Sequence, residues 1–156
     1  MTSANPIETR SLAYMAKQRG GAQGLPMLQA LVGEMFDSAG EHDGCAFMRH
    51  VGRRMANELG TPSASTLEAL EEAINNQWLG MDWGWVTLTT DGRSLTLTHG
   101  AYPGAGGGSS QWQAAMAALL EGLYEAWLVV LGEGAPLKVS CMEQVEMALV
   151  FRCHGA

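Results

Sequence analysis

The sequence has few basic residues, few cysteines and no long unbroken apolar run. Nine Lys and Arg stand against sixteen Asp and Glu, so the formal net charge is -7. Because affinity for nucleic acids comes mainly from neutralising phosphates, we expect no DNA or RNA partner. No segment approaches the roughly 18 apolar residues of a membrane span, so we expect no direct membrane insertion. The first residues lack the apolar region of a signal peptide, which favours a cytoplasmic location.

Cysteine and histidine are too sparse and too scattered to indicate a metal centre or a reactive site. Cys45, Cys141 and Cys153 show no CxxC spacing, and the four histidines show no HxH or HxxxH spacing. The chain contains no GxSxG motif, and the glycine-rich segment 104–108 is not followed by the lysine of a phosphate-binding loop. We therefore expect no catalytic residue, no metal, no cofactor and no enzymatic activity.

The chain divides into an N-terminal arm and one larger domain. Residues 1–24 mix polar residues with three glycines, which predicts a mobile arm with a short helix near residues 8–18. Residues 25–156 are long enough to bury a core without disulfides or metals. We predict that they form a single α+β domain.

Four segments of this domain repeat apolar residues every three or four positions, as amphipathic helices do. They cover residues 25–40, 43–59, 65–79 and 111–131. The third begins with Ser65-Thr66-Leu67-Glu68, which is typical of a capping box. The predicted buried stripe of the second segment consists of Phe47, Met48, Val51, Met55 and Leu59.

Two further segments alternate apolar and polar residues, as strands do. In residues 83–100, Asp91-Gly92 predicts a two-residue type I′ turn that pairs Leu88 with Leu95 and Val86 with Leu97. The opposite face of this hairpin would carry Trp85 and several threonines, a surface that solvent, a partner or a sugar could cover.

The second hairpin is predicted over residues 136–153. A three-residue loop at 142–144 would pair Val139 with Met147 and keep the apolar faces matched. In that register Cys153 is too far from Cys141 for a disulfide. The predicted fold is α+β, with several amphipathic helices packed on an antiparallel four-stranded sheet made of two hairpins.

The last predicted helix contains Gly122 in its interior. A glycine there costs about 1 kcal/mol relative to alanine, which indicates that another backbone approaches closely. Tyr124 and Trp127 follow it and would add mass to an interface or to the core. We take Gly122, Tyr124 and Trp127 as candidate interface residues.

Several strings, in their order along the chain, resemble the D-subunit family of bacterial cellulose synthase. They are Val51-Gly52-Arg53-Arg54-Met55, Trp83-Gly84-Trp85-Val86-Thr87-Leu88 and, above all, Leu120-Glu121-Gly122-Leu123-Tyr124 with Trp127. The similarity runs from about residue 25 to residue 152. It implies a non-catalytic accessory protein of cellulose biosynthesis, glucan export and biofilm formation, whose protomers pair into dimers that stack into an octameric ring.

The resemblance also implies partners and a site. The ring would align the synthase complexes, contact other cellulose synthase subunits and guide glucan chains through passages between protomers for crystallisation. Because family members contact glucan largely through N-terminal segments, Gly24, Leu25 and Pro26 are candidate glucan-binding residues. Trp85 and Tyr102 are added because aromatic rings stack on sugars. The implied location is the cytoplasm beside the inner-membrane synthase complex, with the periplasm as the alternative.

The order of elements also resembles small-molecule-sensing or trafficking domains of the vinyl-reductase type. In that alternative, the Met-rich helices would surround an apolar pocket for a lipid or hydrocarbon. The two functions predict different oligomeric states and different internal cavities. A scaffold should form a large ring without a sizeable internal cavity, whereas a sensor should form a dimer with an enclosed pocket.

Overall fold

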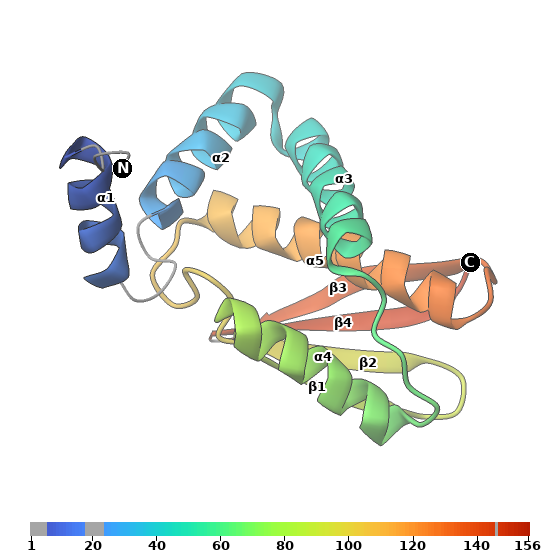
Figure 1. Ribbon diagram of the computed structural model, residues 1–156. Helices are drawn as coiled ribbons and strands as arrows, with labels where there is room; N and C mark the ends of the chain where they lie inside the picture. Colours follow the sequence, from blue (N-terminus) through green and yellow to red (C-terminus); the bar gives the residue numbers. More distant parts are fainter. Residues whose placement is uncertain (1–5, 18–23, 146) are drawn as a thin grey trace.

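The computed structural model describes residues 6–17, 24–145 and 147–156, and it has the predicted α+β fold (Figure 1). In chain order the elements are α1 (Pro6–Lys17), α2 (Leu25–Ala39), α3 (Glu41–Leu59), α4 (Leu67–Met81), β1 (Trp85–Thr90), β2 (Leu95–Gly100), α5 (Ser110–Leu131), β3 (Leu137–Val145) and β4 (Ala148–Gly155). The strands form one antiparallel sheet in the order β1-β2-β4-β3, so the two predicted hairpins lie side by side.

The helix ends follow the sequence signals closely. α1 lies within the predicted arm, and the last residue of the helix predicted there, Gln18, is outside the described residues. The mobility of the arm stays a prediction. α4 is capped by Thr66, whose hydroxyl accepts a hydrogen bond from the N–H of Ala69 at 3.1 Å. The predicted capping box is wrong because the residue three positions after this cap is Ala69, not Glu68.

The fold has three layers, with α5 in the middle. α4 packs on β1 and α5 packs on β3 and β4, so both helices cover one face of the sheet, while α2 and α3 pack on α5 (Figure 1). α5 is long and apolar enough to cross a membrane by length and composition, which corrects the expectation that no segment approaches this level. Since 61% of its most apolar window is buried inside the protein, it serves as the central helix of the core.

α3 and α5 cross with their backbones in direct contact at two glycines. A Cβ atom on Gly52 would collide with the carbonyl oxygen of Leu119, and one on Gly122 would collide with the carbonyl oxygen of Arg49. The close backbone approach that Gly122 predicted is therefore made by α3 of the same chain.

This crossing changes which face of α3 is buried. The buried residues are Gly44, Met48, Gly52 and Ala56, a stripe of mostly small side chains. The predicted stripe was wrong in part, since Phe47 is exposed and only Met48 of that set is fully buried. The reason is that the closest contact between helices needs small residues, whereas the periodicity argument selects large apolar ones.

The first hairpin is paired two residues away from the predicted register. β1 and β2 pair Leu88 with Leu97 and Val86 with His99, not with Leu95 and Leu97. Because the side-chain period of a strand is two, this shift leaves each side chain on its predicted face.

The loop of this hairpin explains the shift. It has four residues, 91–94, and Gly92 is the only one of them with positive φ, whereas a type I′ turn needs two such residues. The carboxylate of Asp91 instead accepts hydrogen bonds from the N–H groups of Arg93 and Ser94, both at 2.8 Å. Side-chain capping of this kind allows a longer loop.

The second hairpin also differs from its predicted register. β3 continues to Val145 and β4 begins at Ala148, so the predicted loop at 142–144 lies within β3. Val139 pairs with Cys153, and the extra residue is taken up in a bulge after Cys141. Cys153 is therefore only two residues from Phe151, the partner of Cys141, closer than the predicted register implies, and both cysteines are free thiols.

Side chains of α5 close the β3 edge of the sheet. The carboxylates of Glu121 and Glu125 accept hydrogen bonds from the N–H groups of Cys141 and Val139, at 3.2 and 3.1 Å. The same carboxylates pair with Arg49 and Arg53 of α3, at 3.4 and 3.8 Å. Two glutamates one turn apart thus connect α3, α5 and the outer strand.

Side chains of α4 close the opposite edge, at β1. The amide of Asn75 donates to the carbonyl oxygen of Val86 and accepts from its N–H, at 2.9 and 2.8 Å, and Glu71 accepts from the N–H of Leu88 at 2.8 Å. Both outer strands therefore have helix side chains where another strand would otherwise pair.

Replacing Asn75 with alanine should remove both hydrogen bonds to Val86. We expect the free energy of unfolding to fall by roughly 2 kcal/mol, because two partly buried backbone groups lose their partners. Chemical denaturation of the variant measures this change. Asn76→Ala is the matched control, since Asn76 lies next to it on the same helix, makes neither of these bonds and should change stability by less than about 0.5 kcal/mol. Equal losses in the two variants would contradict the role given to Asn75.

Candidate functional site

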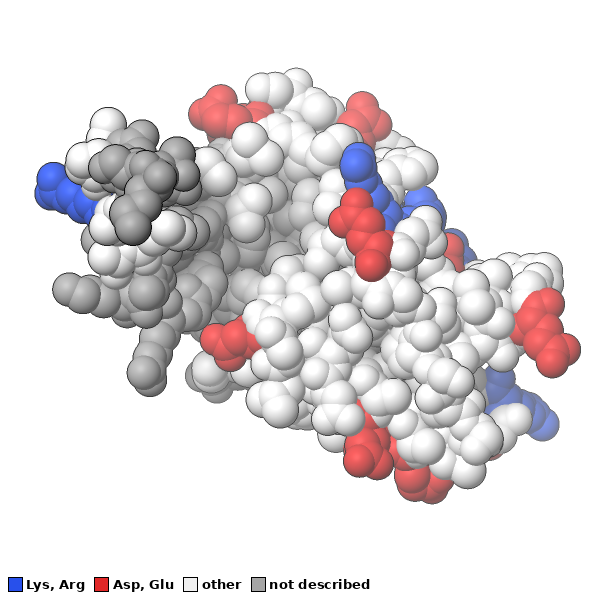
Figure 2. Space-filling model, viewed as in Figure 1, with Lys and Arg blue, Asp and Glu red and all other residues white. Residues whose placement is uncertain are grey.

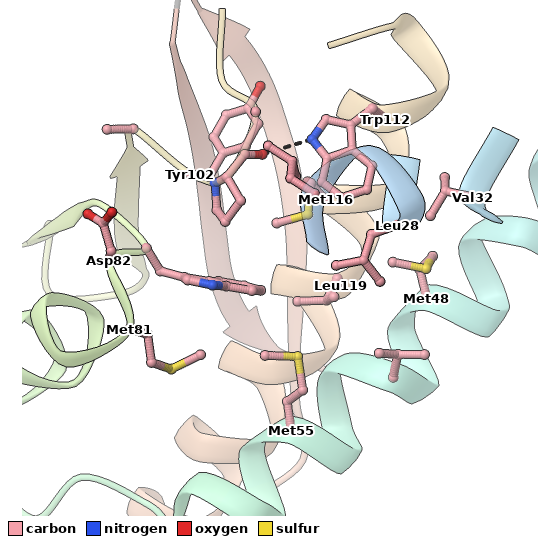
Figure 3. A pocket seen from close by; sticks show the side chains of 16 residues that line it. Leu28, Val32, Met48, Met55, Met81, Asp82, Tyr102, Trp112, Met116 and Leu119 are labelled. Atoms are coloured by element: carbon pink, nitrogen blue, oxygen red, sulfur yellow. Dashed lines mark hydrogen bonds between the residues drawn. The ribbon is translucent and has the colours of Figure 1, made fainter. Parts of the chain in front are cut away.

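A recess of about 490 Å³ opens between α2, α3, α5 and the loops that follow α4 and β2 (Figure 3). We call it the apolar pocket. Among the described residues that line it, Asp82 is the only charged one, and it lies at the end of α4. The apolar side chains come from Met48, Met55, Met81 and Met116, from Trp83, Tyr102 and Trp112, and from Leu25, Leu28, Val32, Val51 and Leu119.

Two of the lining loops have left-handed backbone at residues other than glycine. Asp82 has φ 55° and ends α4, where its N–H donates to the carbonyl oxygens of Leu79 and Trp78. Ala101 has φ 53° directly after β2, and its N–H donates to the carbonyl oxygen of Met147 at 2.9 Å. Such conformations are uncommon outside glycine, so these bonds hold the loops in place.

The aromatic side chains of the apolar pocket are fixed by hydrogen bonding and stacking. Trp112 Nε1 donates to the carbonyl oxygen of Pro103 at 2.8 Å, as the dashed line in Figure 3 shows. Trp83 stacks on the buried Trp78, with ring centroids 5.6 Å apart and an angle of 15° between the rings. The wall of the pocket is therefore joined directly to the core.

A buried polar network lies directly behind Trp83. His99 Nε2 is 2.7 Å from the carbonyl oxygen of Trp83, and Nδ1 is 2.5 Å from the hydroxyl of Tyr124. Because a carbonyl can only accept, Nε2 carries the proton and Nδ1 accepts from Tyr124. The Tyr124 oxygen in turn accepts from Trp78 Nε1 at 3.0 Å. Every polar atom of this network has a hydrogen-bond partner, so the side chains are fixed in a single arrangement.

Burial determines the protonation of this network. It lowers the pKa of His99 from 6.5 to about 4, although the hydrogen bond to Trp83 acts in the opposite direction. Burial also raises the pKa of Tyr124. At neutral pH both side chains are therefore uncharged, and the histidine serves as a neutral bridge between the core and the pocket wall.

The thiols are not activated as nucleophiles. Burial, with the nearby Glu121 carboxylate as a second cause, raises the pKa of Cys141 to about 11. Burial also raises the pKa of Cys45 and of Cys153. A thiol that stays protonated at neutral pH is a poor nucleophile and a poor metal ligand. Over the described ranges, no group of three or more His, Cys, Asp or Glu side chains could hold a metal ion.

The apolar pocket has the size and the lining of a binding site. Pockets for small molecules span roughly 300–1,000 Å³ and are mostly apolar. Unbranched methionine side chains adapt to the shape of an apolar partner. The pocket can therefore hold an apolar group, and the carboxylate of Asp82 in its lining disfavours a neighbouring negative charge.

The five candidate glucan-binding residues fall into two places. Leu25 and Tyr102 both line the apolar pocket, and Gly24 and Pro26 flank Leu25 at the start of α2. Trp85 lies on the other face of the sheet, where its ring covers Gly100 and remains 47% exposed. The threonines predicted beside it are Thr87, Thr96 and Thr98, which follow the same alternation.

The three candidate interface residues lie in the core of one chain. Gly122, Tyr124 and Trp127 are all buried, and Trp127 Nε1 donates to the carbonyl oxygen of Ala56 at 3.3 Å. Their contacts are with α3, α4 and the sheet, so we assign them to packing within the chain.

His99 and Trp83 were not predicted as site residues from the sequence. The alternation of its strand could have identified His99, because it is two residues after Leu97 and therefore faces inward on the same side. A histidine at an inward position needs a buried partner. Trp83 lies in the short connection between α4 and β1, where no periodicity indicates which way a side chain points.

Comparisons with known proteins identify a family and several relatives. A family model for the D subunit of cellulose synthase matches residues 10–154. A protein of Komagataeibacter xylinus named "Cellulose synthase operon protein D" is 35% identical over 104 residues, which cover 65% of this chain and 66% of that protein. A protein of the same name from Komagataeibacter sucrofermentans is 31% identical over 103 residues, with coverage of 65% and 66%. The chain thus spans just under two thirds of the length of these relatives.

Proposed function

The chain belongs to the D-subunit family of cellulose synthase, and on this premise we propose that it is a non-catalytic accessory protein of bacterial cellulose synthesis. The observation that carries the proposal is the extent of the family match. It runs from residue 10 to residue 154 and so includes the α3–α5 crossing, the apolar pocket and nearly all of the four-stranded sheet. The resemblance in the strings around Gly52, Trp85 and Gly122 agrees with this match.

In this role the protein would work as an assembly. We propose that chains pair into dimers and that dimers stack into an octameric ring, which aligns the synthase complexes and contacts other cellulose synthase subunits. Glucan chains would pass between the protomers. We place the assembly in the cytoplasm beside the inner-membrane synthase complex, with the periplasm as the alternative, and cell fractionation distinguishes the two.

Light scattering of the purified full chain tests the assembly. We expect a species with the mass of eight chains, and a clean single-chain mass would overturn the scaffold. A dimer that also retains an apolar compound would favour the alternative, a sensing or trafficking domain. The apolar pocket of about 490 Å³ is larger than expected for a scaffold, but it is an open recess and not the enclosed pocket that this alternative predicts.

Trp85 is the residue that best fits a sugar contact. Its exposed ring is on the strand face that also carries Thr87 and Thr98, and the combination of an aromatic face with hydroxyl groups suits a glucan chain. We expect Trp85→Ala to weaken binding of a cello-oligosaccharide to the full assembly by about tenfold in calorimetry. Leu79→Ala, at an exposed position on α4, is the control. Unchanged affinity in the Trp85 variant would remove this residue from the glucan path.

A further inference from the structure

The first half of α2 has large apolar side chains on its solvent side. Met27, Leu28 and Leu31 are 68%, 48% and 63% exposed. We call these three residues the α2 ridge. Met27 and Leu31 are four positions apart, so they lie one above the other on the helix. Val32 of the same helix is buried against the core. α2 is therefore apolar on two sides, as is typical of a helix that is covered on both.

The α2 ridge lies in a segment without charge. Residues 24–33, GLPMLQALVG, contain no Asp, Glu, Lys, Arg or His. Figure 2 shows charged side chains at several separate places on the visible face, both Asp and Glu and Lys and Arg, and the chain as a whole has more Asp and Glu than Lys and Arg. With a net charge of -7, two copies of the chain repel each other. Contact through an uncharged apolar segment brings the least repulsion.

Several of the other exposed apolar side chains fit self-association less well. Met142, Val145 and Met147 also lie close together in sequence, at the end of the second hairpin, but the exposed Glu143 lies among them. Leu79 and Val130 are single exposed side chains near the ends of α4 and α5. Asn75, Glu71, Glu121 and Glu125 bind backbone N–H groups of the outer strands, which disfavours addition of a strand from another copy there.

We propose that the α2 ridge is a contact between two copies of this chain, packed helix against helix about a twofold axis. In such a contact each surface meets its own counterpart, so an uncharged ridge meets another uncharged ridge. This inference rests on the self-assembly proposed above, and it names the surface through which two chains pair. A strongly charged partner would form no ion pair with this segment, because residues 24–33 contain no charged side chain.

The contact has a consequence for the apolar pocket. Leu28 belongs to the α2 ridge and also lines the pocket (Figure 3). Leu25, about one turn earlier on α2, lines it too. A second copy seated on the ridge therefore lies at the rim of the pocket and covers apolar surface that one chain leaves open. The two pockets of a pair then lie on either side of the shared helices.

Leu31→Asp in the full chain tests the contact. The buried carboxylates of two copies would face each other without a cation, so we expect pair formation to weaken by roughly thirtyfold or more in sedimentation or light scattering over a concentration series. Leu79→Asp is the matched control and should assemble like the original chain, because Leu79 is 79% exposed outside the ridge. Circular dichroism shows whether each variant is folded.

Cysteine cross-linking gives a second readout that does not depend on destabilising the contact. We expect Met27→Cys or Leu31→Cys to form disulfide-linked pairs under mild oxidation, whereas Leu79→Cys and the original chain, with its three native thiols, do not. A single-chain mass for the original protein would remove both the proposed scaffold and this contact. An assembly that keeps its size in Leu31→Asp and is not linked at either ridge position would overturn the contact alone.

Discussion

Gly122→Ala should lower the free energy of unfolding by about 2 to 3 kcal/mol. The added methyl group would collide with the carbonyl oxygen of Arg49, and both partners are helix backbone, which cannot turn aside as a flexible side chain can. α3 and α5 would have to move apart, which loosens the packing of the α3 stripe around Gly52. Alanine gains about 1 kcal/mol of helix propensity over glycine, and this net figure already includes that gain. Urea denaturation measures the change.

Gly33→Ala is the matched control for this prediction. Gly33 is also inside a helix, but a Cβ atom there meets only Gln111 Oε1, at an ordinary distance of 3.7 Å. We expect Gly33→Ala to leave stability unchanged or to raise it by up to about 1 kcal/mol. If the two variants behaved alike, the crossing of α3 and α5 would be looser than the structure describes.

Acid should destabilise the protein through His99. Burial lowers the pKa of this histidine from 6.5 in the unfolded chain to about 4 in the folded chain. Between these values the unfolded chain binds a proton that the folded chain does not, so stability falls as the pH is lowered from 6.5 towards 4. The loss amounts to roughly 3 kcal/mol at pH 4, because each pH unit contributes about 1.4 kcal/mol.

The contribution of His99 can be separated from that of the carboxylates by a variant that does not titrate. We expect His99→Gln to show a shallower fall of stability between pH 6.5 and 4 than the original chain, whatever its stability at neutral pH. His154→Gln, at an exposed position, should keep the original slope. A slope that His99→Gln leaves unchanged would mean that the charged imidazole is tolerated beside Tyr124 and Trp83.

Local patterns predicted the elements well, because they depend on neighbours in the sequence. The spacing of apolar residues placed the helices within a few residues, and the alternation in the first hairpin placed each side chain on the correct face. The registers were wrong because they depend on the number of residues in a loop or a bulge. Asp91 closes a four-residue loop with its side chain, and the extra residue of the second hairpin lies near Cys141 rather than in the loop.

The site was harder to predict, because it is assembled across the chain. Tyr102 and Trp85 were selected for the same aromatic character, yet the fold places one in the apolar pocket and the other on the open face of the sheet. Gly122 correctly indicated a close backbone, but nothing near it in the sequence identifies α3 as the partner. Similarly, the methionines of the pocket come from α3, α4 and α5, and only their packing brings them together.

The hydrogen bonds from helix side chains to the outer strands of the sheet affect the tendency of the protein to aggregate at high local concentration. An antiparallel sheet with a bare outer strand can grow without end, which is the route to amyloid-like fibrils. Here Glu121 and Glu125 on one side and Asn75 and Glu71 on the other bind backbone N–H groups of the outer strands, so a further strand could not pair at these positions. At these described positions, contact between crowded copies through side chains is favoured over strand addition, and such contacts favour particles of finite size.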